Sequence, residues 1–366
     1  MHLEIQSVNY DRYAVTGLKG RYLPPELAYS ILNAIGLLNP VQIIGKSCLN
    51  RPIYSIKIGS GSLKILLWSQ MHGNESTTTR AFLDVLNFLN HKHELANELL
   101  QHLTITFIPQ LNPDGSQLFT RVNRNGIDLN RDALEMSQPE SEVLRRVFDD
   151  IGPDYCFNLH DQRSIFGVGS TGTAATLSFL APSANLSREI TNSRAVAMQI
   201  IAGIHDRLNS LIPGGIGRFD DSFNPNCVGD QFQMQGVPTI LFEAGHYAQD
   251  YDRATTRKLL FYAFLEAFCL ISKSSFDQFT VHQYFEIPEN EKNFVDIHVF
   301  NPHLIDPKAG PESVLKLQYE EQLQHNNIVF APKYLEATSG SGIFAHRIVN
   351  CAIEQDRNWI STHSLL

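Results

Sequence analysis

Two side chains that can bind a metal ion lie three residues apart in the stretch SQMHGNESTTTRAFLDVLNFL, residues 69–89. His72 and Glu75 stand where an apolar, strand-like run, KILLW, gives way to the apolar pattern of a helix. Residues three apart on a helical turn share a face, so this imidazole and this carboxylate can point at one ion. An isolated H-x-x-E motif more often arises by chance, with His72 a polar loop residue and Glu75 a favourable anion in a first helical turn.

Further polar groups follow other apolar runs. The turn NPDG (112–115) follows ITFIPQL, His160 follows YCFNL, and Glu243 follows TILF. Ligands of open α/β sheets bind outside the carboxyl ends of the strands, so we expect these groups at one edge. Zinc takes three protein ligands when it must also hold water, and His160 is the predicted third ligand. Glu243 with His246 is a rival pair, ranked lower because extended residues three apart point to opposite faces.

The stretch NPDGSQLFTRVNRNGIDLNRDA, residues 112–133, makes the pattern specific. Together with H-x-x-E, the strand-terminal His and the strand-terminal Glu, it resembles the zinc carboxypeptidase family, the M14-type metallopeptidases or funnelins. The motifs occur in the family's order over residues 40–275. The position of Arg121, shortly before GIDLNR, is more similar to compact microbial and cytosolic members, including murein-peptide amidases, than to the digestive enzymes.

The resemblance implies a metal centre and its proton acceptor. His72, Glu75 and His160 match the ligands of one zinc ion, and Glu243 matches the general base and acid. Asp128 matches an acid that orients the first zinc histidine. These roles agree with the chemistry, because a zinc-activated water needs a nearby carboxylate to take its proton. A metal-bound imidazole also tends to donate its other N–H to a carboxylate.

The resemblance also implies residues that bind the substrate. Arg121 matches the arginine that polarises the scissile carbonyl, and Asn130 with Arg131 matches the pair that holds a terminal carboxylate. A guanidinium keeps its charge and its fork fits a carboxylate. Taken singly, Arg121 is equally a solvated loop charge, and Arg131 equally a partner of Asp132 or Glu135.

Two family features of the substrate side are missing. Gly73 and Asn74 stand where the digestive enzymes carry an arginine between the first two ligands. The stretch GRFDDSFNPNCVGDQ contains no tyrosine at the place of their mobile tyrosine; Ser222 or Phe223 falls nearest, and Tyr247 lies close by in the sequence.

The substrate preference is left open by the sequence. The pocket floor is predicted in residues 216–235, where Arg218 either favours an acidic substrate or pairs with a neighbouring aspartate. Asp161 and Arg163, directly after the third ligand, either contact substrate or form a local ion pair.

The rest of the chain must position these groups. Of the 366 residues, 43% are hydrophobic, enough for a large packed interior. Apolar strands alternate with predicted helices, which favours a mixed, largely parallel α/β sheet covered by helices on both faces. The helices are predicted at Thr78–Leu89, Pro139–Asp150, Ser187–Leu211 and Arg253–Ser272. We expect an N-terminal extension (1–38) with one short helix, a zinc carboxypeptidase-like catalytic domain (39–275), and a small β-rich C-terminal domain (276–366).

Composition limits the partners. A net charge of −9 argues against nucleic acid, and no run is long enough to span a membrane. The first twenty residues lack the pattern of a secretory signal, and five scattered cysteines suit reduced thiols, so we expect a cytoplasmic protein.

The predicted activity is zinc-dependent hydrolysis of a peptide bond with one Zn²⁺ per chain, removing a C-terminal residue. One alternative is an amidase or deacylase of the same fold that acts on a small amide or a cell-wall peptide. The other is a catalytically silent binding protein that keeps the pocket; the intact set of His72, Glu75, His160 and Glu243 argues against it.

Overall fold

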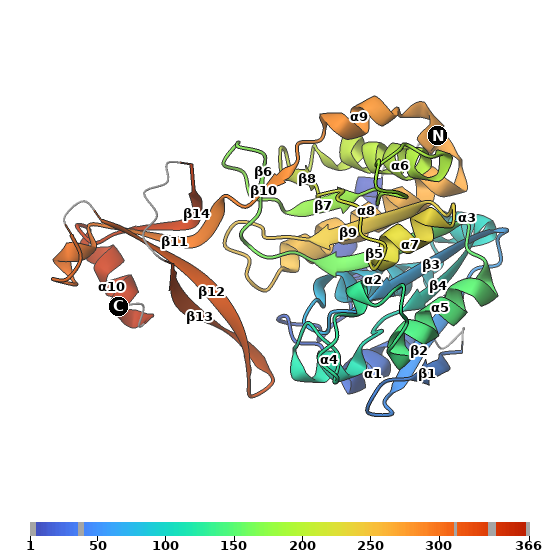
Figure 1. The fold of residues 1–366 in the computed structure, drawn as a ribbon, viewed down its shortest axis with the longest axis horizontal. Helices are drawn as coiled ribbons and strands as arrows, with labels where there is room; N and C mark the ends of the chain where they lie inside the picture. The colour runs from blue at the N-terminus through green and yellow to red at the C-terminus, as the bar shows by residue number, and fades with distance from the viewer. Residues whose placement is uncertain (1–4, 36–39, 311–312, 336–341, 364–366) are drawn as a thin grey trace.

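The computed structural model describes residues 5–35, 40–310, 313–335 and 342–363. A large sheet with helices on both faces forms most of this structure, and a separate small sheet carries the C-terminal part (Figure 1). The predicted α/β fold with an additional C-terminal β region is therefore confirmed. No helix among these residues is both long and apolar enough to cross a bilayer.

The large sheet has eight strands in the order β1-β2-β4-β3-β5-β9-β7-β8. The central run β4-β3-β5-β9 is parallel, whereas β1-β2, β2-β4 and β7-β9 are antiparallel. The strands are β1 (Gln42–Lys46), β2 (Pro52–Ile58), β3 (Leu63–Ser69), β4 (Leu103–Ile108), β5 (Tyr155–Asp161), β7 (Leu177–Leu180), β8 (Ile216–Arg218) and β9 (Thr239–Ala244). Because parallel strands run in one direction, β3, β5 and β9 all end at the same edge of the sheet.

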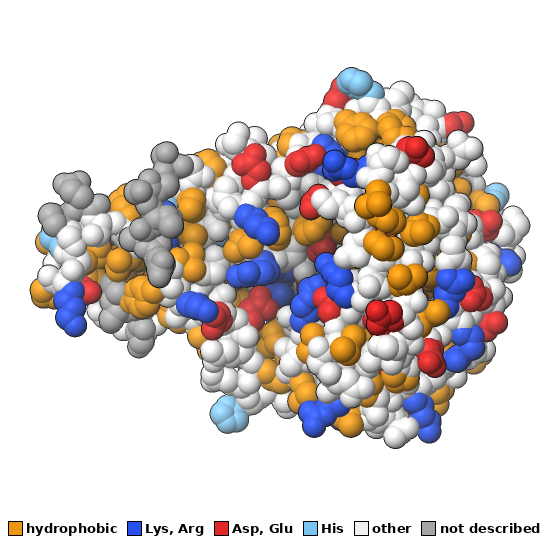
Figure 2. Space-filling model, in the orientation of Figure 1, with side chains coloured by type: hydrophobic (Ala, Val, Ile, Leu, Met, Phe, Trp, Pro, Cys, Tyr) orange, Lys and Arg blue, Asp and Glu red, His pale blue; other side chains and the backbone are white. Residues whose placement is uncertain are grey.

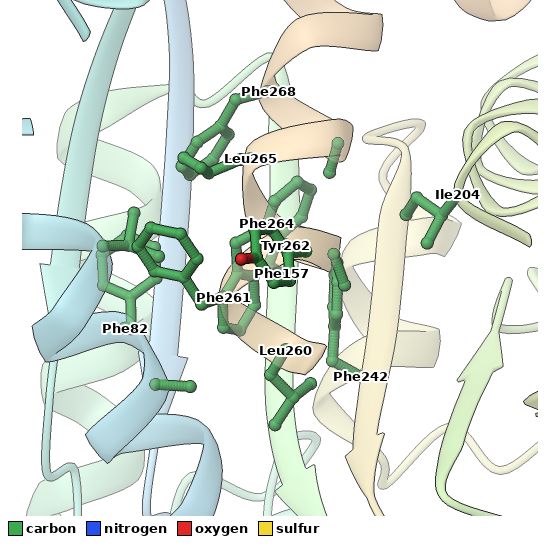
Figure 3. Close-up of a cluster of buried hydrophobic side chains, with 14 of the residues drawn as sticks. Phe82, Phe157, Ile204, Phe242, Leu260, Phe261, Tyr262, Phe264, Leu265 and Phe268 are labelled. Carbon is green, nitrogen blue, oxygen red and sulfur yellow. The ribbon is translucent and has the colours of Figure 1, made fainter. Parts of the chain in front are cut away.

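Each face of this sheet has its own core. Along β3, Ile65 and Leu67 pack into the larger hydrophobic cluster, while Leu66 and Trp68 face the smaller one. Successive strand residues point to opposite faces, so an unbroken apolar run such as KILLW needs cover on both sides. On the larger side, Phe264 packs against Phe82 and against Phe242 of β9 (Figure 3).

The helices that cover the sheet include the four predicted from periodicity. They are α2 (Thr77–Leu89), α5 (Pro139–Ile151), α6 (Asn192–Leu208) and α8 (Ala254–Ser272). The remaining helices are α1 (Pro25–Ile35), α3 (Glu94–His102), α4 (Pro113–Leu118), α7 (Val228–Met234), α9 (Val281–Glu286) and α10 (Glu354–Thr362). Apart from α1, these helices are short, between six and nine residues. They contain too few turns for a repeating apolar pattern to be recognised in the sequence.

The segment before the sheet packs on the catalytic core. Tyr10 donates its hydroxyl to Asp84 of α2 over 3.0 Å, and Arg257 of α8 forms an ion pair with the same carboxylate. The predicted helix of this segment is α1; its predicted end at residues 36–38 lies outside the described residues. The division into an extension and a catalytic domain stays a prediction.

The C-terminal sheet has the order β13-β12-β11-β14. Its strands are β11 (Phe294–Phe300), β12 (Val314–Gln324), β13 (Asn327–Leu335) and β14 (Phe344–Asn350). Buried side chains of β11, β12 and β14, with Ile360 of α10, form a small core of its own. A two-stranded pair of β10 (Asn290–Glu291) and β6 (Gly167–Val168) joins this region to the main sheet. The boundary predicted at residue 276 is not tested by this arrangement.

Candidate metal centre and substrate pocket

The carboxyl edge of β3, β5 and β9 collects the predicted metal-binding and catalytic side chains. His160 on β5 pairs in register with Glu243 on the neighbouring β9. His72 lies in the turn after β3, which the chain enters through Gln70 at a positive φ of 44°. A Cβ atom added at Gly73 would lie 2.0 Å from the carbonyl carbon of Gly115, so this turn is pressed against the NPDG segment and has no room for an arginine at that position.

The NPDG segment supports that turn as a structural element. The Asn112 side chain accepts a hydrogen bond from the amide of Gly115 over 2.8 Å and so begins helix α4. Asp114 accepts from the amide of Leu49 over 3.0 Å. These contacts agree with turn chemistry for the motif.

His72, Glu75 and His160 converge on one point. The Nδ1 atom of His72 lies 2.9 Å from Oε1 of Glu75, and Nδ1 of His160 lies 2.9 Å from Oε2 of the same carboxylate. The two Nδ1 atoms are 3.1 Å apart, and all three residues are buried. Two imidazoles and one carboxylate that share a small space are the nitrogen and oxygen donors that zinc takes. The described residues therefore fit a zinc ion, with an open side toward the pocket.

Asp128 and Arg121 stand behind this cluster. Asp128 Oδ1 lies 2.9 Å from Nε2 of His72 and also accepts the amide of Asn130 over 2.9 Å. Arg121 lies 3.2 Å from Glu75 and 3.1 Å from Asp128. Burial alone would raise the pKa of Asp128, but the hydrogen bond and charge of His72, with the Arg121 charge, hold that pKa well below its usual range. The carboxylate is thus ready to accept the second N–H of His72.

Glu243 is the buried carboxylate left over at this edge. Its side chain lines the pocket beside the metal-binding cluster, and its Oε2 atom has no hydrogen-bond partner among the described residues. Burial, followed by the charges of Glu75 and Asp161, raises the pKa of Glu243 well above its ordinary value. A divalent cation on Glu75 would offset that repulsion and favour the ionised form.

The rival pair does not come together as a metal site. His246 lies beyond the end of β9, and its ring packs 4.1 Å from that of His346 and 4.6 Å from that of Tyr251. Among the described residues, neither Glu243 nor His246 belongs to a group of three closely spaced metal-binding side chains.

A pocket of about 540 Å³ opens beside the cluster. Asn130 and Arg131 line it, and each contacts the start of α7. The Asn130 side-chain oxygen accepts the amide of Val228 over 3.0 Å, and Arg131 lies 3.1 Å from the sulfur of Cys227. Asp132 is engaged elsewhere, as the acceptor of Ser137. The Arg131 guanidinium, which is exposed, can therefore reach a bound anion.

The floor of the pocket contains an acid that the sequence analysis did not single out. Asp230, on the short helix α7, is buried and lines the pocket, and burial raises its pKa to about 7. Its only sequence signal is its place within residues 216–235. Arg218, in contrast, pairs with Glu289 over 2.9 Å and is not among the residues that line this pocket.

Asp161 and Arg163 follow the third ligand, and the sequence left their roles open between substrate contact and a local ion pair; the structure separates them. Asp161 is buried and accepts the amides of Thr77 and Thr78, at 3.0 and 3.3 Å, at the start of α2. Arg163 is exposed and lines the pocket. Ser222 and Phe223 also line it, and Tyr247 is 39% exposed and does not.

Comparisons with known proteins point to one family. A family model, Peptidase_M14, described as zinc carboxypeptidase, matches residues 36–155. Carboxypeptidase 2 of Trichophyton rubrum is 29% identical over 102 residues, which cover 27% of this chain and 19% of that protein. Cytosolic carboxypeptidase 6 of Mus musculus is 32% identical over 94 residues, or 25% and 17% of the two chains. The chain thus aligns with about a fifth of the length of these curated relatives.

Solved structures share the fold over a larger part of the chain. A metallo-carboxypeptidase from Burkholderia cenocepacia has a TM-score of 0.55 and 17% identity and covers 70% of each chain. A metallo-carboxypeptidase from Pseudomonas aeruginosa, in complex with (2-guanidinoethylmercapto)succinic acid, has a TM-score of 0.56 and 17% identity and covers 68% of this chain and 69% of its own. The predicted resemblance to the zinc carboxypeptidase family is therefore confirmed.

Proposed function

We propose that this chain, which has the zinc carboxypeptidase fold and family motifs, hydrolyses a peptide bond with one bound zinc ion and releases a C-terminal residue. The observation that carries the proposal is the meeting of His72, Glu75 and His160 with Glu243 at one sheet edge, above a pocket that contains Arg131. The zinc would be held by the two Nδ1 atoms and the carboxylate. When bound, it supplies a Lewis acid that polarises the carbonyl and makes water a better nucleophile.

The protein's own groups then divide the remaining work. Glu243 accepts the proton of the attacking water and returns it to the leaving amine. Arg121 is half exposed and adjacent to Glu75, so its guanidinium can stabilise the negative charge that develops on the carbonyl oxygen. Asp128 holds His72 in the tautomer that leaves Nδ1 free for the metal.

Arg131 and Asn130 hold the free carboxylate of the terminal residue. The fork of Arg131 can make two parallel, charge-assisted hydrogen bonds with a carboxylate. The hydrogen bond that the Asn130 side-chain oxygen accepts from the Val228 amide fixes this pair relative to the pocket floor. Recognition of the terminal carboxylate restricts hydrolysis to the last peptide bond of the substrate.

An amidase or deacylase on the same fold is the second candidate. The observation that favours it is the pocket wall, where Ser222 and Phe223 stand and no tyrosine is found among the described lining residues. Without a phenol to contact the terminal residue, a small amide or cell-wall peptide also fits the metal chemistry.

The test separates the two. Purified protein reconstituted with zinc is assayed for bound metal, and hydrolysis of an N-blocked dipeptide is compared between its free-acid and C-terminally amidated forms. We expect one zinc per chain and a clear preference for the free acid. Equal rates on both forms would replace the exopeptidase by the amidase, and protein that binds no zinc would overturn both.

We also propose a cytoplasmic location and a peptide or small amide, rather than nucleic acid or membrane, as the substrate. All five cysteines are free thiols in the structure, which suits a reducing compartment. Fractionation of cells that express the chain would test the location.

A further inference from the structure

A second pocket, of about 420 Å³, lies on the other side of the metal-binding cluster. One wall is formed by β12 of the C-terminal sheet, through residues 318–322. Glu75, Arg121 and Arg163 line both this pocket and the first one. In Figure 2, Lys and Arg side chains gather in the hollow where the C-terminal sheet meets the main domain. The second pocket thus continues the substrate cleft past the metal-binding cluster.

The positions of the two pockets determine the orientation in which a peptide substrate would bind. Asn130 and Arg131, which are proposed to hold the terminal carboxylate, line only the first pocket. A peptide whose last residue occupies that pocket must leave the metal-binding cluster on the side of the second. The residues before the scissile bond therefore pass between Arg163 and β12.

Most charges of the second pocket are already paired within the protein. Arg21 forms an ion pair with Glu321 of β12, and Glu320 is paired with Lys333 over 2.6 Å. Arg253 is buried and lies 3.5 Å from Asp161, and its guanidinium also donates to the carbonyls of residues 162 and 244. Arg121 is shared between Glu75 and Asp128.

Arg163 differs from these other arginines. It is exposed, and the structure gives it no ion pair or hydrogen bond with any described residue. The residue after it is fixed to the C-terminal sheet: Gln318 donates to the Ser164 hydroxyl over 2.9 Å, and His346 lies 2.6 Å from the Ser164 carbonyl oxygen. Arg163, a cation without a partner among the described residues, thus lies between Gln162, which the main domain holds, and Ser164, which the C-terminal sheet holds.

We propose that the second pocket is the subsite for the part of the substrate that precedes the scissile bond, and that Arg163 selects a carboxylate there. The inference rests on the proposed peptidase function for the direction of the chain. A guanidinium recognises a carboxylate through a forked, charge-assisted contact. A substrate with an acidic side chain at this position should therefore bind more tightly than one with a neutral side chain of the same shape. The C-terminal sheet is, on this proposal, part of the substrate-binding site.

Binding rather than turnover is the first measurement. The zinc-loaded Glu243→Gln variant is titrated calorimetrically with N-blocked dipeptides that differ only in the residue before the scissile bond, glutamate or glutamine. We expect the glutamate peptide to bind about ten-fold more tightly, the usual worth of a charged hydrogen bond. In an Arg163→Gln background the ratio should fall to about one. Arg12→Gln removes an exposed positive charge that lines neither pocket, and the ratio should persist there.

A gain-of-function variant tests the β12 wall. Gln322 is exposed and lines the second pocket, so Gln322→Arg should increase the glutamate preference, whereas Gln278→Arg, on an exposed site outside the pocket, should not. Equal affinity for the two peptides in the Glu243→Gln protein overturns the inference. A glutamate preference in binding, combined with no turnover of either peptide by the wild-type protein, overturns the proposed function and leaves only the recognition of a carboxylate by Arg163.

Discussion

The metal-binding cluster and the substrate walls are built differently. His160 and Glu243 lie on neighbouring strands with a fixed register, and His72 lies in a turn pressed against a second turn. Arg121 and Arg131, in contrast, are exposed residues outside the sheet; Arg121 pairs with Glu75 and Asp128, and Arg131 lies 3.1 Å from the sulfur of Cys227. The sheet fixes both the position and the direction of its side chains. Loops fix the positions of their side chains less tightly. We therefore expect a substitution in the substrate walls to change the rate moderately, and a substitution in the metal-binding cluster to abolish the reaction.

The largest effect is expected for His72→Ala. Removal of one of three ligands should abolish stoichiometric zinc binding, and kcat/KM should fall by more than about 10⁴-fold, since both the metal and the alignment of Glu243 are lost. Bound metal is measured by elemental analysis beside turnover. His325→Ala, on the exposed tip of the β12–β13 hairpin, is the control. Full zinc occupancy in His72→Ala would mean that this cluster is not the metal site.

Glu243→Gln should separate chemistry from metal binding at the same edge. The amide keeps the shape but cannot accept a proton, so zinc should stay bound while kcat falls by roughly 10²–10⁴-fold. Steady-state kinetics and metal analysis of the same preparation check this, with the exposed Glu135→Gln as a control. Turnover close to that of the wild-type protein would show that another group takes the proton.

Arg131→Ala tests the wall rather than the cluster. Loss of a charged hydrogen bond should lower kcat/KM on free-acid peptides by about 2–3 kcal/mol, mainly through a higher KM, because the grip persists through the reaction. Amidated peptides should be affected little. Arg124→Ala removes another exposed arginine of the same segment that does not line the pocket. An equal loss for both substrates would place Arg131 outside carboxylate recognition.

The smallest effect concerns stability and pH. Burial raises the pKa of Asp230 to about 7 in the folded protein, above its ordinary value of 3.8. Between these values the folded chain keeps a proton that the unfolded chain has lost, so this group makes stability fall as pH rises through that window. Asp230→Asn keeps an oxygen that can accept the Asn224 amide but cannot ionise. Its melting temperature should exceed that of the wild type by a few degrees at pH 8 and approach it near pH 4. A constant difference across pH would exclude this titration.

Long helices could be predicted from the sequence more closely than short elements and pockets. The long helices α2 and α8 were predicted to within a residue at each end, because α2 carries a recurring apolar face and α8 a nearly continuous apolar run. The predicted start of α6 was wrong by five residues, since residues 187–191 form a polar segment before the Thr191 cap. Asp230 escaped detection, because a single acid in the seven-residue helix α7 carries no pattern.

The sequence by itself determined the chemistry available at the site. The order of the metal-binding motifs, the apolar strands before them and the spacing of His72 and Glu75 follow from local residue types and can be read without coordinates. Only the tertiary structure decided which charges remain free. Asp161 accepts two backbone amides at the start of α2, whereas Arg163, two residues later, has no ion pair or hydrogen bond with any described residue, and the C-terminal sheet contacts its neighbour, Ser164. Pairing of this kind joins residues more than 150 positions apart in the sequence, and no local pattern encodes it.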